Sequence, residues 1–238
     1  VDEAHLVSDK DTAMYNHIFS ECKKVNPNFF VIGLSACLYR GRMGSLTNGS
    51  VFTDIAYDLT DVDGFNKLLE QGYLAPLVPR PTRNYFSTEG LVSSSGDFTS
   101  SSQEAKFDKA EITSACIDEI LEMAYDRHCW MIFASGTKHS DHIADELNAR
   151  GIPAVSIHSK HTAKHNDDGI EAFKTGKIRC LVNYGKLTTG FDHAPIDFIA
   201  VMRVTKSPNL WVQILGRGVR PYDGRLAGQY IRGFEYIK

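Results

Sequence analysis

Long apolar runs are missing from this sequence of 238 residues. The longest, at 29–34 and 129–134, are much shorter than the roughly 18 residues that a membrane-spanning helix needs. Paired cysteines are missing as well, because the five cysteines are scattered and no C-x-x-C motif occurs. This pattern is typical of reduced thiols and not of a disulfide framework or a zinc site. We therefore expect a cytoplasmic protein with no membrane partner.

A strong excess of charge is also missing. The net charge is −3, and the shares of charged residues (23%) and hydrophobic residues (42%) are ordinary for a globular protein. A global basic field is thus excluded, so any binding of nucleic acid has to use a local groove. The length suits one large domain or two modest ones.

The first part of the chain predicts half of an α/β layer. Apolar spacing indicates a helix over 9–27 and another around 62–71, and the unbroken apolar run at 29–36 is typical of a parallel strand covered on both faces. A strand or extended exit is expected over 73–79. The Ser/Gly-rich stretch 87–103 offers little to pack and predicts a linker or mobile loop.

From residue 104 onward helices and strands alternate regularly. Such alternation predicts a mostly parallel sheet with helices on both faces and with function at the carboxyl ends of its strands. The expected helices cover 106–127, 138–150, 166–174 and 207–216, and the expected strands cover 129–134, 152–157, 178–183, 196–202 and 229–237.

The opening stretch VDEAH (1–5) carries two adjacent carboxylates. An aspartate at the carboxyl end of a strand, here Asp2, can hold Mg²⁺ against nucleotide phosphates. The neighbouring Glu3 can orient and deprotonate an attacking water. Acidic pairs also occur on solvated helix starts, so this alternative stays open for the stretch taken alone.

Two further stretches follow predicted strands. In GLSACLYR (33–40), Ser35 lies where it can hydrogen-bond His5, although a plain strand end has the same composition. In YGKLTTGFDHAP (184–195), a polar turn offers exposed amides to a phosphate, although Thr, Gly and Asp are common in ordinary loops.

The fourth stretch is WVQILGRGVRP (211–221), in which Gln213, Arg217 and Arg220 are spaced for one helix face. Arginines at such a site can neutralise a γ-phosphate as charge develops on it. The alternative is a solvated basic face. The two interspersed glycines would destabilise a plain surface helix, which favours a functional site.

In this order the four stretches resemble motifs II, III, V and VI of the superfamily 2 DEAD/DEAH-box helicases, and IFASGTKHSDHIADEL (132–147) resembles motif IV. SACLYR (35–40), LLEQGYLAPLV (68–78) and the segment 187–221 are most similar to RadD-type DNA helicases. The resemblance implies an α/β fold with tandem RecA-like domains, of which the first is incomplete. It divides the chain into the C-terminal part of domain 1 (1–85), a linker or mobile loop (86–105) and domain 2 (106–238).

The resemblance further implies an ATP-dependent DNA helicase or translocase with a role in DNA repair. It implies ATP and Mg²⁺ as cofactors and single-stranded or partly duplex DNA as partner, with RNA not excluded. Cys37 departs from the family pattern, because motif III usually has a hydroxyl residue there. The implied roles are catalysis for Asp2, Glu3, Arg217 and Arg220, Mg²⁺ binding for Asp2, coupling for His5, Ser35 and Gln213, nucleotide contact for Gly190 and Asp192, and nucleic-acid contact for Ser135, His158, Thr188 and Thr189.

The phosphate-binding loop G-x-x-x-x-G-K-[ST] does not occur in these 238 residues. The nearest stretch, FKTGKIR (173–179), lacks the first glycine and has Ile178 in place of the hydroxyl residue. We therefore expect the chain alone to be inactive. Three accounts stay open: a segment lost from a longer protein, a loop supplied by a separate subunit as in a split restriction-system translocase, or a non-catalytic nucleic-acid-binding module. The first account, truncation at both ends, is the simplest, because a chain that starts inside a strand leaves sheet edges uncovered. The expected partner is then a missing N-terminal RecA-like segment, in cis or in trans.

Overall fold

Among the residues that the computed structural model describes, four parallel strands form one sheet in the spatial order β6-β7-β5-β8. The described residues are 1–8, 10, 13–40, 44–49, 51–187, 190–226 and 229–231. The strands are β5 (Trp130–Ala134), β6 (Ala154–Ile157), β7 (Cys180–Asn183) and β8 (Phe198–Met202). The predicted α/β fold with a mostly parallel sheet is confirmed.

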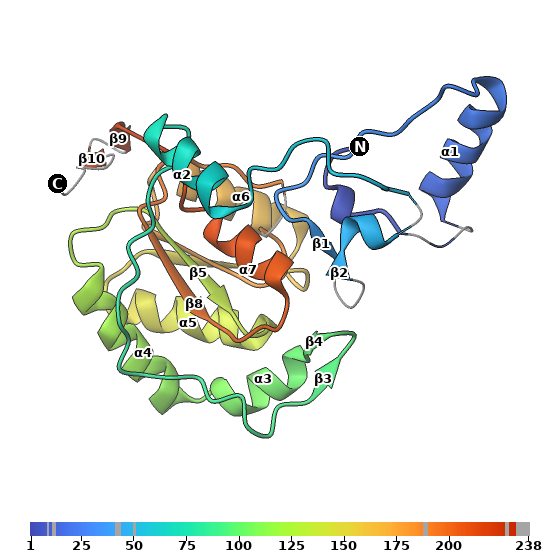
Figure 1. Ribbon diagram of the computed structural model, residues 1–238. Helices are drawn as coiled ribbons and strands as arrows, with labels where there is room; N and C mark the ends of the chain where they lie inside the picture. Colours follow the sequence, from blue (N-terminus) through green and yellow to red (C-terminus); the bar gives the residue numbers. More distant parts are fainter. Residues whose placement is uncertain are drawn as a thin grey trace.

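Helices cover both faces of this sheet (Figure 1). On one face lie α4 (Ala110–Met123) and α5 (Thr137–Ala149), and on the other lie α6 (Ala163–Lys174) and α7 (Pro208–Leu215). Every side chain of β5 is buried because both faces of this central strand are covered. The fully buried residues of the core include Ile117, Trp130, Ile132, Ile143, Leu147, Phe173, Leu181 and Ile214.

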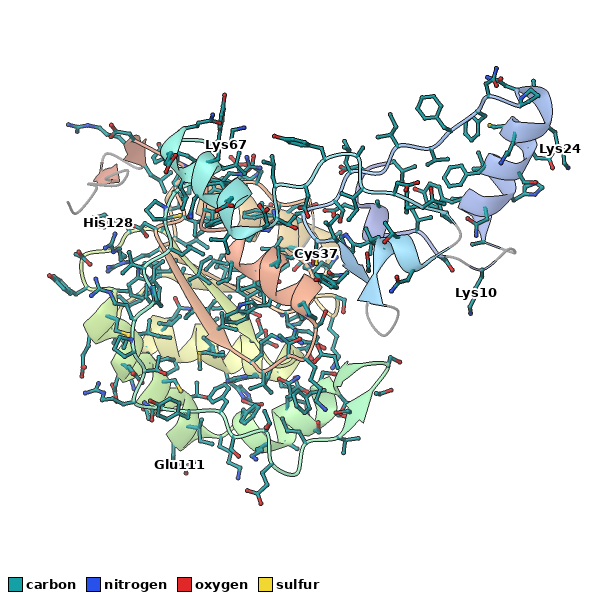
Figure 2. The ribbon with its side chains drawn as sticks, in the orientation of Figure 1. Lys10, Lys24, Cys37, Lys67, Glu111 and His128 are labelled. Atoms are coloured by element: carbon teal, nitrogen blue, oxygen red, sulfur yellow. The ribbon has the colours of Figure 1, made fainter. Side chains whose placement is uncertain are left out.

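The described residues of 1–61 form an arm. It projects from the body, which is the sheet with the helices that cover it (Figure 1). None of the residues of α1 (Met14–Val25), all of which are described, is buried. Lys24 lies at the far end of the arm, whereas the buried Cys37 lies where the arm meets the body (Figure 2). The remaining elements before residue 72 are η1 (Ala4–Leu6), β1 (Tyr39–Arg40), β2 (Gly44–Ser45), η3 (Leu46–Asn48) and α2 (Val62–Glu70).

The buried strand predicted over 29–36 is not a buried strand in the structure. The segment is extended and pairs with the first residues of the chain: Leu34 N–H donates to the Val1 carbonyl at 2.8 Å, and Ala4 N–H donates to the Leu34 carbonyl at 2.9 Å. These bonds join two parallel extended segments. Most of its side chains stay exposed, so the segment lacks the two covering layers that bury β5.

The apolar side chains of this segment are correspondingly exposed. Phe30, Ile32 and Leu34 have exposed fractions of 75%, 63% and 63%. Because side chains two residues apart in an extended chain point to the same side, the three form one apolar face. The first region thus carries the strand-like pattern but not the packing that the pattern predicts.

The chain that leaves α2 joins the body. Ala75 is buried and its N–H donates to the Val219 carbonyl at 2.8 Å. Further on, the buried carboxylate of Glu119 on α4 accepts from the backbone N–H of Arg83 at 2.5 Å and from the side chain of Asn84 at 2.8 Å. Residues 75–84 therefore pack on the C-terminal body, although they lie inside the predicted unit 1–85.

The prediction of an unpacked loop over 87–103 is wrong for the second half of that stretch. A hairpin of β3 (Ser93–Ser94) and β4 (Asp97–Phe98) leads into α3 (Ser100–Phe107), which Thr99 caps by accepting from Ser102 N–H. Gln103 is fully buried, and its side-chain oxygen accepts from Val204 N–H at 3.0 Å. The serines and glycines thus form a cap and turns, and a single buried glutamine holds the segment on the body.

Two more predicted elements have different bounds in the structure. The helix expected over 106–127 is divided between α3 and α4, because the chain leaves the helical conformation at Asp108 and Lys109. The strand expected over 229–237 begins as β10 (Gln229–Ile231), which pairs antiparallel with β9 (Gly224–Leu226). Residues 232–237 lie outside the described part of the chain. None of the described helices is long and apolar enough to cross a membrane.

Candidate functional site

His5 connects the arm to α7. Its ring is buried, with Nδ1 2.9 Å from Ser35 Oγ and Nε2 3.2 Å from the side-chain nitrogen of Gln213. An amide nitrogen only donates, so Nε2 accepts and Nδ1 carries the proton. Ser35 Oγ donates onward to the Cys37 carbonyl at 2.7 Å. The structure therefore brings the three expected coupling residues into one hydrogen-bonded chain.

The two carboxylates next to His5 differ in their surroundings. Glu3 has φ +49°, a left-handed conformation that non-glycine residues rarely adopt, and it turns the chain from the extended segment into η1. Its carboxylate lies 3.4 Å from His5 Nδ1 and is about one-third exposed. Asp2 is exposed and accepts from Glu3 N–H at 2.9 Å. One carboxylate thus faces the buried imidazole, and the other faces solvent.

Two arginines follow α7. The guanidinium of Arg217 donates to the Phe191 carbonyl. Burial lowers the pKa of Arg217, and the negative charges of Glu3 and Asp192 oppose that effect. The more exposed Arg220 lies 3.3 Å from Asp192, measured from Nε to Oδ1. Two carboxylates that are far apart in the sequence, Glu3 and Asp192, therefore act on one partly buried guanidinium, and the second guanidinium lies beside Asp192.

The arginines do not share a helix face with Gln213. Helix α7 ends at Leu215, and the next backbone bonds, from Arg217 N–H to Ile214 and from Gly218 N–H to Leu215, are those of tight turns. Gly218 also lies close to the body, because a Cβ there would be 2.8 Å from Ile199. The predicted helix face is thus wrong beyond Leu215.

The polar turn after β7 is described in part. Gly190 is exposed with φ +70°, a conformation that favours glycine, and Asp192 is exposed beside Arg220. Thr188 and Thr189 lie outside the described residues. Gly190 and Asp192 therefore line the same region as the two arginines.

Ser135 and His158 lie apart from this cluster, after β5 and β6. Ser135 is fully buried with Oγ 2.7 Å from His139 Nδ1. His158 is 2% exposed, with Nε2 2.9 Å from Asp141 and Nδ1 accepting from Lys160 N–H at 3.2 Å. Both side chains are buried, and their contact with nucleic acid stays a prediction.

Sequence reasoning missed the partners of His158. The spacing of His158, His161 and His165 is visible in the sequence, but Asp141 comes from the preceding helix. A carboxylate 17 residues upstream of the first histidine carries no signal that a local pattern detects.

Comparisons with known proteins show similarity to helicases. Residues 112–222 match the family description "Helicase conserved C-terminal domain". The putative mitochondrial ATP-dependent helicase irc3 of Schizosaccharomyces pombe is 29% identical over 225 residues, which are 93% of this chain and 35% of that protein. The putative ATP-dependent helicase IRC3 of Saccharomyces cerevisiae is 24% identical over 228 residues, or 94% of this chain and 32% of its own length.

Among solved structures, helicase Lhr of Mycobacterium smegmatis, bound to ssDNA and AMP-PNP, gives a TM-score of 0.41 at 18% identity. The match covers 52% of this chain and 17% of that one. The chain spans about a third of the length of the two curated relatives that it matches. Residues 112–222 are thus similar to a helicase conserved C-terminal domain, and the two curated proteins that match most of this chain are described as putative ATP-dependent helicases.

Proposed function

We propose that this chain is the part of a superfamily 2 helicase or translocase that couples ATP hydrolysis to movement on nucleic acid. The observation that carries the proposal is the contact of His5 with Ser35 on one side and Gln213 on the other. It joins the motif with the two carboxylates to the helix that precedes the two arginines. A change at the nucleotide is thereby transmitted to α7, because moving His5 breaks one of its two bonds.

In this proposal ATP supplies the bond that is hydrolysed, and Mg²⁺ neutralises its phosphate oxygens. The donor set fits such a group: Asp2 offers an exposed carboxylate to the cation, and Glu3 holds the attacking water and takes its proton. Arg217 and Arg220 neutralise the γ-phosphate, and guanidinium is suited to this because it stays charged when partly buried. Gly190 and Asp192 contact the nucleotide from the same side.

The nucleic acid is held mainly through its phosphates, so binding is salt-dependent and largely independent of sequence. We propose single-stranded or partly duplex DNA as the partner, with RNA as the alternative. Thr188 and Thr189 would supply backbone contacts, and the exposed Lys160 and Lys164 replace the arginine usual in the family. The RadD-type similarity and the role in DNA repair stay predictions, as does the cytoplasmic location, since the S. pombe relative is described as mitochondrial.

We further propose that a RecA-like segment, in cis or in trans, supplies the phosphate-binding loop and covers the arm. The support is the apolar face formed by Phe30, Ile32 and Leu34, which is exposed in this chain. Covering such a face is favourable by about 25 cal/mol for each Å² removed from water. The chain by itself is then inactive. A split motor assembled from two subunits corresponds to the in-trans version.

The decisive experiment measures phosphate release from Mg-ATP by the 238-residue chain and by a longer protein that includes the upstream segment, with and without single-stranded DNA or RNA. We expect turnover only in the longer protein, stimulated by nucleic acid and lost in Arg220→Ala. Arg83→Ala is the matched control, because Arg83 forms an exposed ion pair with Glu122.

Two results would contradict the proposal. Turnover by the 238-residue chain alone would show that the phosphate-binding loop is replaced by other residues. Nucleic-acid binding that is indifferent to ATP in both proteins, without turnover, would identify a non-catalytic binding module.

A further inference from the structure

Three side chains that commonly bind metal ions meet where β6 leads into α6. Asp141 on α5, His158 directly after β6 and His161 in the following loop each offer one ligand atom, and these atoms lie within 4.8 Å of one another. Asp141 Oδ1 is 2.9 Å from His158 Nε2 and 3.2 Å from His161 Nε2. Asp141 is 40% exposed and His161 25%, so the group is open to solvent on one side.

The proton positions show that His161 has a lone pair to offer. Its Nδ1 lies 3.1 Å from the Ser156 carbonyl, which only accepts, so Nδ1 carries the ring proton. The other ring nitrogen, Nε2, faces the Asp141 carboxylate oxygen at 3.2 Å, and in the neutral ring it carries the lone pair.

Two electron-rich atoms in this arrangement repel each other unless a cation lies between them. The bond from His161 Nδ1 to a backbone carbonyl is also the one that metal-bound histidines commonly make.

We propose that Asp141, His158 and His161 bind one divalent transition-metal ion of the zinc type. Imidazole nitrogen with one carboxylate oxygen is a donor set that suits Zn²⁺. His158 carries its proton on Nε2 in the metal-free chain, because Nδ1 accepts from Lys160 N–H. When Nε2 binds the ion, that proton moves to Nδ1 and the 3.2 Å bond from Lys160 is given up.

Such a site joins α5 to the loop between β6 and α6, and it leaves one position of the ion open to water. It is separate from the Mg²⁺ site proposed at Asp2, which has no imidazole in its donor set. His165 lies outside this group of ligand atoms, and its Nε2 donates to the Ser156 carbonyl at 3.0 Å. The proposal does not depend on the ATPase function.

The test is a calorimetric titration of the 238-residue chain with ZnCl₂, repeated for His161→Ala and Asp141→Asn. The matched control is His142→Ala, because His142 forms an exposed pair with Asp108, 2.7 Å apart, on the same helix as Asp141. We expect one Zn²⁺ per chain, at least tenfold weaker binding in each of the first two variants and unchanged binding in the control. Excess Mg²⁺ should not compete.

Replacing Zn²⁺ by Co²⁺ gives a second readout, because visible absorption of the bound ion reports nitrogen and oxygen ligands and should disappear in His161→Gln. Circular dichroism verifies that the variants are folded, which their exposed positions favour. The proposal is overturned if the wild-type chain binds no Zn²⁺, if both ligand variants bind it as tightly as wild type, or if His142→Ala loses it to the same extent.

Discussion

The arm and the C-terminal body contain similar apolar runs but bury them differently. In the body, Trp130 and Ile132 of β5 are completely buried between two layers of helices. In the arm, Phe30 and Ile32 belong to an equally apolar run, yet they stay mostly exposed. Apolar sequence alone thus does not bury a strand, because burial needs layers that cover both faces.

The two regions also differ in the contacts that stabilise them. The body is stabilised by its own core, whereas the arm depends on a few specific contacts. One of them is the pair of backbone bonds with Leu34, and another is the side-chain contact between His5 and Gln213. Elements held by few contacts open locally more easily than a packed core does.

Truncating one apolar side chain in the body and one in the arm tests the difference in burial most directly. Ile132→Ala should lower the free energy of unfolding by about 2–5 kcal/mol, because it leaves a cavity between two layers. Phe30→Ala should change it by less than about 0.5 kcal/mol, because the ring is already in water. Urea denaturation followed by circular dichroism measures both. Equal losses would show that the arm has a core of its own.

Acidification should affect the body through a buried histidine. Burial lowers the pKa of His139 to about 4, below its ordinary 6.5. The unfolded chain therefore binds more protons between these values, and stability is complete above pH 6.5 and falls as the pH drops toward 4. The full shift corresponds to a loss on the order of 3 kcal/mol. His139→Gln should flatten this part of the urea-measured pH profile, whereas His17→Gln, at an exposed position of α1, should leave it unchanged.

Close packing of α6 on the sheet depends on one glycine. A Cβ at Gly169 would lie 2.8 Å from Val155 Cγ1 and 2.9 Å from Ile157 Cδ1. Gly169→Ala improves helix propensity by about 1 kcal/mol but overpacks the interface by about 1–3 kcal/mol, so we expect a net loss of about 1 kcal/mol. The exposed Asp168→Ala on the same helix is the control in thermal denaturation. A rise in stability for Gly169→Ala would mean that the strand side chains can move aside.

The smallest expected effect concerns the contact between arm and body. A double-mutant cycle with His5→Ala and Gln213→Ala should give a coupling energy of about 0.5–1.5 kcal/mol, as for one buried hydrogen bond. His17 on α1 is exposed, so His17→Ala with Gln213→Ala should give no coupling. Urea unfolding measures each variant. Zero coupling for His5 would mean that the arm is not held through this pair.

Much of the body could be predicted because its signals are local. The apolar runs and the alternation after residue 104 predicted β5 to β8 and α5 to α7, with ends that moved by a few residues. The candidate site was predicted residue by residue through the resemblance, and the meeting of His5, Ser35 and Gln213 agrees with it. The helix face predicted for Gln213, Arg217 and Arg220 was wrong, because the glycines after Leu215 let the chain turn away from α7.

The sequence by itself determined which segments are apolar, where they alternate with helices and which polar residues follow each strand, because these properties depend on residues only a few positions apart. Only the tertiary structure decided which apolar runs are covered, that Gln103 holds a serine-rich segment on the body, and that Asp141 faces His158 and His161. These outcomes depend on contacts between segments that are distant along the chain, and a local pattern contains no information about such partners.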